Sequence, residues 1–298
     1  MNTGYLLLFV GLLGFSLLGI LHKVADHPQC RPRMIALILL FWGGVLTTIY
    51  TAAFSEKGMS FPQPVIWIGA AGGAMASLAL FAFQSGLKHG KISTSWLLLN
   101  LATSVPVVLS IFLFGEKLNW GKGIGLILAL AALLMMWSDK KLEEAQAAGT
   151  ETASTGTGSR SKWLPLMLLA FVLQGLAAAS QKTLVEAGAG DYVWQFYVVL
   201  YWTGFAVMTL LSIRREALPT RREFATALAM AMCSVLGNIS ITSAMNSVKG
   251  VVAYPVSNGG SLTLVALAGV LFFREKIHPI GIAGIACGIG AILVLVMT

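Results

Sequence analysis

Ten charge-free, mostly apolar runs follow one another along the chain. Bounded by Lys, Arg, Asp or Glu, they cover residues 1–22, 34–55, 58–87, 92–115, 123–138, 163–181, 192–213, 224–248, 250–273 and 277–298. About 20 apolar residues, with a usual range of about 17–25, let a helix cross a bilayer core of about 30 Å. Nine runs reach that length, and 123–138 does so once residues 118–121 around Lys122 are added. Because backbone groups in lipid must pair within their own segment, each run is expected to be a helix. The pattern predicts an all-α membrane protein of ten transmembrane helices.

One long polar stretch, residues 139–162, interrupts this pattern. It begins with the charged piece DKKLEEAQAA and continues as TETASTGTGSRSK, which is rich in Gly, Ser and Thr. That composition is typical of a flexible surface linker. The chain is therefore predicted to divide into a first repeat, 1–138, the linker, 139–162, and a second repeat, 163–298, with five helices in each repeat.

The two halves resemble each other at a nearly constant spacing. FGEK at residues 114–117 recurs as FREK at 273–276, an offset of 159. Further pairs follow in the same order with offsets of 158 or 159: Lys23 and Lys182, Trp96 and Tyr254, Asn100 and Asn258, and Gly125 and Gly284. Each copy holds an odd number of helices, so the second copy must cross the membrane in the opposite sense. Such an inverted repeat is shared by many transporters.

Composition and charge agree with a membrane location. Of the 298 residues, 57% are hydrophobic and 11% are charged, whereas a soluble domain carries about 25% charged residues. The formal net charge of +8 does not indicate a nucleic-acid partner, because the basic residues lie at helix ends with no soluble domain to present them. The expected partners are a lipid bilayer and a small-molecule substrate, and the expected location is a bacterial inner membrane.

The basic residues also predict an orientation. If the loops alternate between the two sides, one set of loops holds fifteen Lys and Arg residues and the other set holds five. Under the positive-inside rule, the richer set faces the cytoplasm. This places the linker in the cytoplasm and both termini outside.

Candidate substrate-binding residues are neutral or aromatic, because no acidic residue lies inside a run. Two stripes with the spacing i, i+4, i+7 each occupy one helix face. They are Trp96, Asn100 and Thr103 in the fourth helix, and Tyr254, Asn258 and Ser261, with the neighbouring Ser257, in the ninth. Gln174 and Asn238 lie deep within their runs and join this set. Amides donate and accept hydrogen bonds, which suits zwitterionic or polyol-like ligands, and the rings supply apolar or cation–π contact. Alternatively, these polar residues only tie neighbouring helices together.

Lys23, Lys182 and His22 lie at helix ends and are candidates for gates or entrances to a cavity. A lysine at a helix end is more often an anchor that extends to the membrane interface, and this alternative stays open.

Glycine pairs spaced by four residues mark the fifth and tenth helices. They are Gly121 with Gly125 and Gly284 with Gly288. Such pairs allow close packing, either between the halves or between the protomers of a homodimer.

Neither an enzyme nor a metal or cofactor site is expected. No Ser/His/Asp, Cys/His or paired-carboxylate set falls within a run. Cys30, Cys233 and Cys287 lack metal or redox spacing, and the four histidines lie at helix ends or in loops.

The stretch LATSVPVVLSIFLFGEKLNWGKGIGLILALAALLMMW, residues 101–137, resembles the EamA-type half of the drug/metabolite transporter superfamily. The resemblance rests on Pro106, Glu116 and the glycine-bearing last helix. The second copy, with AYPVSNGGSLTLVALAGVLFFREKI at residues 253–277, is also similar to the end of the small multidrug resistance proteins. The resemblance implies two inverted five-helix repeats, a central cavity lined mainly by helices 1, 3, 4, 6, 8 and 9, and alternating access. Small multidrug resistance proteins carry a membrane-embedded glutamate in their first helix, and this chain has none there, which disfavours a proton-coupled exporter of hydrophobic cations.

The expected function is therefore an exporter or facilitator of small polar metabolites such as amino acids. Two alternatives remain. One is a flippase for lipid-linked sugars or lipids, and the other is a membrane subunit or sensor that transports nothing.

Overall fold

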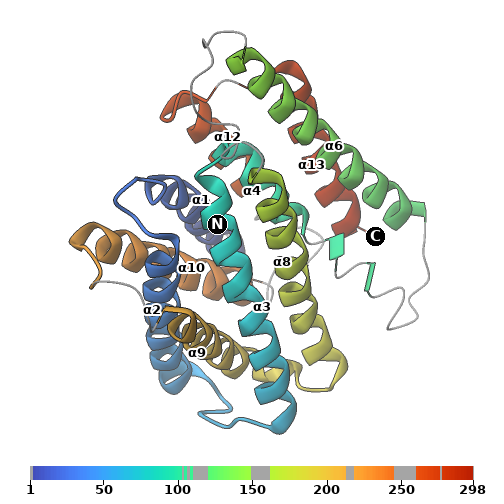
Figure 1. Cartoon of the computed structure of the whole chain (residues 1–298). Helices are drawn as coiled ribbons and strands as arrows, with labels where there is room; N and C mark the ends of the chain where they lie inside the picture. Colours follow the sequence, from blue (N-terminus) through green and yellow to red (C-terminus); the bar gives the residue numbers. More distant parts are fainter. Residues whose placement is uncertain are drawn as a thin grey trace.

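The protein is all-α in the computed structural model, which describes residues 3–102, 104–105, 108–109, 120–148, 162–212, 218–244, 260–275 and 277–297. These residues form ten α-helices and one short 3-10 helix, Gly190–Tyr192, and they contain no strand. The α-helices are α1 (Thr3–Val24), α2 (Pro32–Phe54), α3 (Gln63–Leu87), α4 (Ile92–Leu101), α6 (Trp120–Ala148), α8 (Trp163–Glu186), α9 (Val193–Ser212), α10 (Arg221–Ala244), α12 (Gly260–Leu271) and α13 (Pro279–Met297). Five of these helices come before residues 149–161 and five come after (Figure 1).

Six helices are long and apolar enough to cross a membrane: α1, α2, α3, α8, α9 and α10. Helix α3, for example, runs for 25 residues without a charged side chain, and at about 1.5 Å per residue it exceeds a bilayer core of about 30 Å. Large apolar side chains also point outward, since Phe9, Ile127 and Leu210 are 55%, 70% and 73% exposed. Soluble monomers rarely expose broad apolar surfaces. These features indicate a membrane-embedded helical protein.

The remaining helices are shorter or only partly apolar within the described residues. Apolar stretches occur at Gly123–Ala132 in α6, at Gly260–Leu271 in α12 and at Pro279–Ala291 in α13. Most of the chain between α4 and α6, and all of residues 245–259 before α12, lie outside the described part. Helix α6 continues to Ala148, so residues 139–148 of the predicted flexible linker are helical.

The two sets of five helices interlock. Helix α1 packs along α10 and α3 packs along α8, while α2 lies along α9 and α6 lies along α13 (Figure 1). Each of these pairs joins a helix from before residues 149–161 to one from after them. The close pairing of α6 with α13 uses the predicted fifth and tenth helices inside one chain, whereas the predicted homodimer through them stays a prediction.

Glycine permits the closest of these approaches. A Cβ on Gly73 of α3 would overlap the backbone of Leu200 on α9, and a Cβ on Gly43 of α2 would overlap the ring of Tyr201. Helices α2 and α3 can therefore approach α9 closely enough to bring side chains of all three to the centre of the bundle.

Candidate functional site

Eight helices line a central cavity of about 300 Å³: α1, α2, α3, α4, α8, α9, α10 and α12. The six helices that the resemblance implied, counted along the ten runs, are α1, α3, α4, α8, α10 and α12, and all of them contribute to the wall. Helices α2 and α9 contribute as well. The polar and amphipathic side chains of the lining are His22, Trp96, Asn100, Gln174, Gln181, Tyr197, Tyr201, Ser234, Asn238 and Ser261. Among the described residues that line the cavity there is no Lys, Arg, Asp or Glu.

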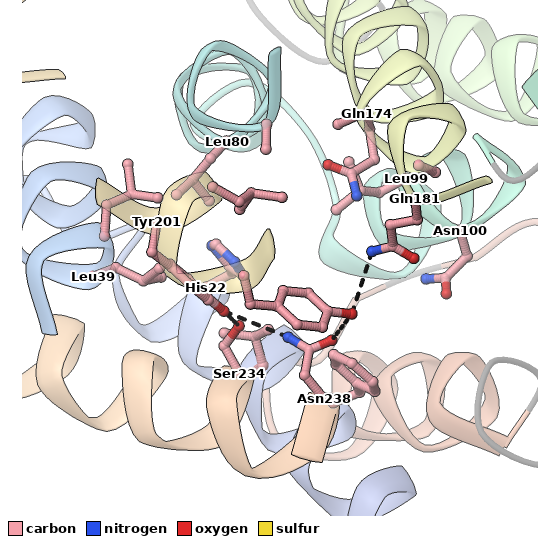
Figure 2. A pocket seen from close by; sticks show the side chains of 18 of the residues that line it. His22, Leu39, Leu80, Leu99, Asn100, Gln174, Gln181, Tyr201, Ser234 and Asn238 are labelled. Atoms are coloured by element: carbon pink, nitrogen blue, oxygen red, sulfur yellow. Dashed lines mark hydrogen bonds between the residues drawn. The ribbon is translucent and has the colours of Figure 1, made fainter. Parts of the chain in front are cut away.

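Five side chains from α8, α9 and α10 form a continuous hydrogen-bonded ladder along the cavity (Figure 2). Tyr201 Oη lies 2.8 Å from Ser234 Oγ and accepts a hydrogen bond from Asn238 Nδ2 at 3.4 Å. Asn238 Oδ1 in turn accepts from Tyr197 Oη at 3.4 Å, and Tyr197 Oη accepts from Gln181 Nε2 at 3.3 Å. The last three bonds are longer than the usual range of about 2.7–3.2 Å, so these groups can rearrange towards a ligand at little cost.

Helix geometry explains why these side chains meet. Tyr197 and Tyr201 are four residues apart on α9, and Ser234 and Asn238 are four residues apart on α10, so each pair lies on one helix face. Gly43 on α2 leaves room for the ring of Tyr201 behind the ladder. The hydroxyl of Tyr201 is thereby directed towards α10.

His22 lies in the cavity wall and is held by Gln84 of α3. Its Nδ1 is 2.6 Å from Gln84 Oε1, and Gln84 Nε2 donates to the backbone carbonyl of His22 at 3.2 Å. The ring edge also packs on Phe83, with centroids 5.0 Å apart at 88°. Because Gln84 presents its carbonyl oxygen to Nδ1, the neutral imidazole carries its proton on Nδ1 and leaves Nε2 as an acceptor.

Helix α4 supplies two of the predicted binding residues, Trp96 and Asn100. Trp96 is buried, and its Nε1 donates to Ser261 Oγ of α12 at 3.4 Å. The Asn100 amide donates to the backbone carbonyl of Trp96 at 2.8 Å while it lines the cavity. Gly19 of α1 faces the indole, and a Cβ there would overlap Val265 and lie 3.0 Å from the Trp96 ring. The structure therefore brings Trp96, Asn100 and Ser261 to one cavity.

Gln174 and Asn238, which were singled out by their depth in apolar runs, also line this cavity. Asn238 stands in the middle of the ladder, whereas the Gln174 amide makes no hydrogen bond to the described part of the chain. The predicted residues Thr103, Tyr254, Ser257 and Asn258 lie outside the described residues, as does the side chain of Lys182.

Two of the predicted entrance residues occupy different places. His22 is buried in the cavity wall, while Lys23 is not part of the lining and pairs with Asp26 at 3.0 Å. Burial raises the pKa of the Asp26 carboxyl above its usual range, and Lys23 partly offsets that effect. Lys23 thus belongs to the end of α1 and its following turn.

Sequence analysis missed Gln181, Tyr197, Tyr201 and Ser234 as cavity residues. The repeat offset contains a signal for one of them, because 181 − 22 = 159 makes Gln181 the counterpart of His22. Tyrosines inside an apolar run gave no such signal, since lipid-facing and cavity-facing rings look alike in sequence.

Ionic contacts cluster at one end of the bundle. The guanidinium of Arg31, which lies between α1 and α2, donates to both carboxylate oxygens of Glu223 on α10 at 2.9 Å each. Glu223 is fully buried and also accepts from the backbone N–H groups of Arg31 and Thr220 at 2.8 Å. The Thr220 hydroxyl accepts from the Glu223 backbone N–H at 3.2 Å, which completes a capping box at the start of α10.

A second buried cluster at the same end joins α4, α6 and the turn before α13. The Asp139 carboxylate lies 3.4 Å from Lys91 Nζ and 3.0 Å from His278 Nδ1. Glu275 Oε1 accepts from the backbone N–H of Ile92 at 2.7 Å. Lys88 Nζ donates to the carbonyl of Cys30 at 2.8 Å and thereby connects the α3–α4 turn to the α1–α2 turn. These contacts show that described residues of several loops in the predicted Lys- and Arg-rich set lie at the same end of the bundle.

Comparisons with known proteins add a fold and no function. No model of a known protein family matches the chain, and no curated protein matches it. Among solved structures, 25 chains match. One of these, a crystal structure described simply as that of a protein, aligns with a TM-score of 0.62 and 18% sequence identity over 99% of this chain and 96% of its own. The protein therefore shares its fold with an experimentally solved structure.

Proposed function

We propose that this protein is a membrane transporter of small polar metabolites such as amino acids, and that it works by alternating access through the central cavity. The observation that carries the proposal is the cavity itself, which helices from both halves enclose and which polar, uncharged groups line. A concave site with mostly apolar walls and a few placed polar groups is the usual form of a small-molecule site.

The packing of the two halves supports an inverted repeat of ten spans. Suppose that α1, α2, α3, α4 and α6 correspond in order to α8, α9, α10, α12 and α13. An exchange of the halves then converts the α1–α10 pair into the α8–α3 pair. Both pairs pack extensively. The same exchange converts α3–α9 into α10–α2, which also pack, and leaves α2–α9 and α6–α13 unchanged. Two copies related by a two-fold axis would produce this pattern.

The ionic clusters support alternating access. Arg31 with Glu223, Asp139 with His278, and Ile92 with Glu275 each connect the first half to the second at one end of the bundle. A transporter closes one end of its cavity while the other is open, and breakable contacts between the halves would serve that closure.

The resemblance to EamA-type halves of the drug/metabolite transporter superfamily fits the same proposal. So does a bacterial inner-membrane location with the ionic end in the cytoplasm, because that end holds the more basic loops.

Binding and flux, measured separately, test the function. Purified protein is screened by thermal shift against a metabolite library, since a ligand above its dissociation constant raises the Tm. Each hit is then supplied as radiolabelled solute to proteoliposomes and to protein-free liposomes. The proposal expects saturable, protein-dependent flux of at least one hit. Hits that raise the Tm but never cross would instead identify a membrane sensor or subunit.

A further inference from the structure

The wall of the cavity that comes from α1, α2 and α3 is apolar apart from His22. It consists of Phe15, Leu18, Leu39, Leu40, Ala76 and Leu80. Leu18, Leu39 and Leu40 are buried members of the hydrophobic core, and Phe15, Ala76 and Leu80 pack against that core. Apart from His22, this side of the cavity offers dispersion contact and no hydrogen bond.

The side of the cavity that comes from α8, α9 and α10 carries a continuous row of polar groups beside the apolar Ala177, Ala178 and Leu200. The ladder from Ser234 through Tyr201, Asn238 and Tyr197 to Gln181 joins its hydroxyl and amide groups into one surface. In Figure 2 the dashed ladder runs from Tyr201 and Ser234 through Asn238 to Gln181, with Leu80 above it and Leu39 beside Tyr201.

The contrast between the walls appears at positions that the repeat offset relates. Leu80 corresponds to Asn238 and Ala76 corresponds to Ser234, because 238 − 80 = 158 and 234 − 76 = 158. Phe15 corresponds to Gln174 by the offset 174 − 15 = 159. Duplication alone would give the two walls the same chemistry. At these three pairs the halves have instead diverged into apolar and polar side chains, whereas His22 and its counterpart Gln181 are both polar.

Hydrogen-bonding capacity remains for a ligand at Gln174 on the α8–α10 side and at His22 on the α1 side. The Gln174 amide has no hydrogen-bond partner in the described part of the chain. The hydrogen bond from Nδ1 leaves Nε2 of His22 as an acceptor. A ligand that offers both donors and acceptors could pair with Gln174 and His22, and with the ladder, whose hydrogen bonds of 3.3–3.4 Å are long.

We propose that the cavity binds an amphipathic solute of zero net charge, with a compact hydrogen-bonding head on the α8–α10 side and a hydrocarbon tail against α1–α3. The inference rests on the proposed function, whose substrate class it narrows. A net charge would be poorly accommodated, because the described lining has no opposite charge to pair with it. The head is either zwitterionic, as in an α-amino acid, or uncharged, as in a diol.

Two homologous series of probes test the tail. The first is glycine, alanine, 2-aminobutyrate and norvaline, and the second is ethane-, propane-, butane- and pentane-1,2-diol. Each added methylene that is buried should tighten binding roughly fourfold until the tail fills the apolar side. Dissociation constants are measured by calorimetry on the purified full-length protein, with aspartate and lysine as charged comparison probes. Affinity that increases with tail length in either series supports the proposal, and the series in which it does so identifies the head as zwitterionic or uncharged.

Two cavity variants and one control locate the two ends of the ligand. Leu80→Asn puts an amide on the apolar wall and should flatten the dependence of affinity on tail length. Asn238→Leu breaks the ladder and should weaken every probe by a similar factor, roughly 3- to 10-fold, with the slope preserved. Leu236→Asn makes the same change as Leu80→Asn on an exposed face of α10 and should leave both slope and affinity unchanged.

Several outcomes would overturn the inference. Affinity that is independent of tail length in both series would do so, as would tighter binding of aspartate or lysine, or no binding of any probe. A Leu80→Asn variant with a lowered ligand-free Tm and an unchanged slope would mean that Leu80 only packs the bundle. Because binding is measured in detergent, a preserved slope without flux in proteoliposomes would refute transport and leave this inference standing.

Discussion

At the scale of single residues, the pairing of His22 with Gln84 explains how a histidine is accommodated in an apolar helix. Burial of an unpaired polar group is costly, and here two hydrogen bonds connect the Gln84 amide to the ring and the backbone of His22. The amide oxygen accepts at Nδ1, so the ring has one defined neutral tautomer. The same amide therefore leaves Nε2 as an acceptor.

Gln84→Leu should remove the hydrogen bond that fixes the tautomer of His22. We expect imidazole ¹⁵N spectra of the wild type to show His22 with the proton on Nδ1, and the variant to show a mixture of tautomers. The unpaired buried donor should also destabilise the variant by about 1–3 kcal/mol. His27, His89 and His278 are internal controls because their signals should not change. An unaltered His22 tautomer in the variant would mean that Gln84 does not set it.

Part of the candidate site was predictable at this scale. The helical spacing of Trp96 and Asn100, the repeated stripe that includes Ser261, and the depth of Gln174 and Asn238 all singled out residues that line the cavity. The two tyrosines of α9 were not predictable, because their role depends on which helix packs opposite them. Gly43 and the α10 partners Ser234 and Asn238 supply that information only in the folded chain.

At the scale of helices, the charge-free runs predicted where helices occur, but they did not predict where each helix ends. Each apolar run contains a helix in the described part of the chain, but α6 extends beyond its apolar stretch into the charged segment that begins at Asp139. Asp139 is buried because Lys91 and His278 approach its carboxylate from other elements. A composition rule counts that residue as linker, since the sequence around it does not reveal its partners.

Gly73→Ala and Gly123→Ala should have opposite effects on stability. A Cβ at Gly73 would overlap the backbone of Leu200, whereas a Cβ at Gly123 meets nothing within 4 Å. Overpacking costs about 1–3 kcal/mol, while an alanine that fits in a helix gains about 0.5–1 kcal/mol over glycine. We therefore expect a lower Tm in detergent for Gly73→Ala and an equal or higher Tm for Gly123→Ala. A Gly73→Ala variant as stable as the wild type would mean that α3 and α9 are not in close contact.

At the scale of the whole molecule, the orientation is open to a direct test. Met59 lies in the α2–α3 loop and Leu218 lies before α10, and both are exposed. In a background without the three native cysteines, Met59→Cys should react with a membrane-impermeant maleimide in intact cells. Leu218→Cys should react only after the membrane is permeabilised, because the basic loops are predicted to be cytoplasmic. The reverse pattern would invert the assignment.

The two ends of the bundle differ in how they are held. At the basic end Glu223 is fully buried against Arg31. At the other end, the ion pair of the described residues joins the exposed side chains of Lys57 and Asp191 at 3.6 Å. Exposed pairs contribute about 0–1 kcal/mol, whereas a bidentate pair between the halves whose carboxylate is buried can favour one conformation more strongly. We therefore expect the resting protein to be closed at the basic end.

Removal of both charges of the buried pair should open that end. The double variant Arg31→Gln/Glu223→Gln leaves no uncompensated buried charge, which a single variant would. Loss of about 1 kcal/mol from the closed form raises the ratio of open to closed molecules about fivefold. Ala178 of α8 lines the cavity, so Ala178→Cys reports on access in the background without native cysteines. Its rate of reaction with maleimide in inside-out vesicles should rise by a similar factor.

The exposed pair at the opposite end supplies the matched control. Lys57→Gln/Asp191→Asn also removes two opposite charges, but it should leave the reaction of Ala178→Cys in inside-out vesicles unchanged, because it lies at the other end of the bundle. If Arg31→Gln/Glu223→Gln lowers the Tm and the reaction rate stays at its original value, the buried pair stabilises the fold without closing the cavity. An equal rise in both double variants would mean that Ala178 is reached by general loosening of the bundle. A rise confined to the first variant would locate the closure between the α1–α2 turn and the start of α10, where the two halves meet.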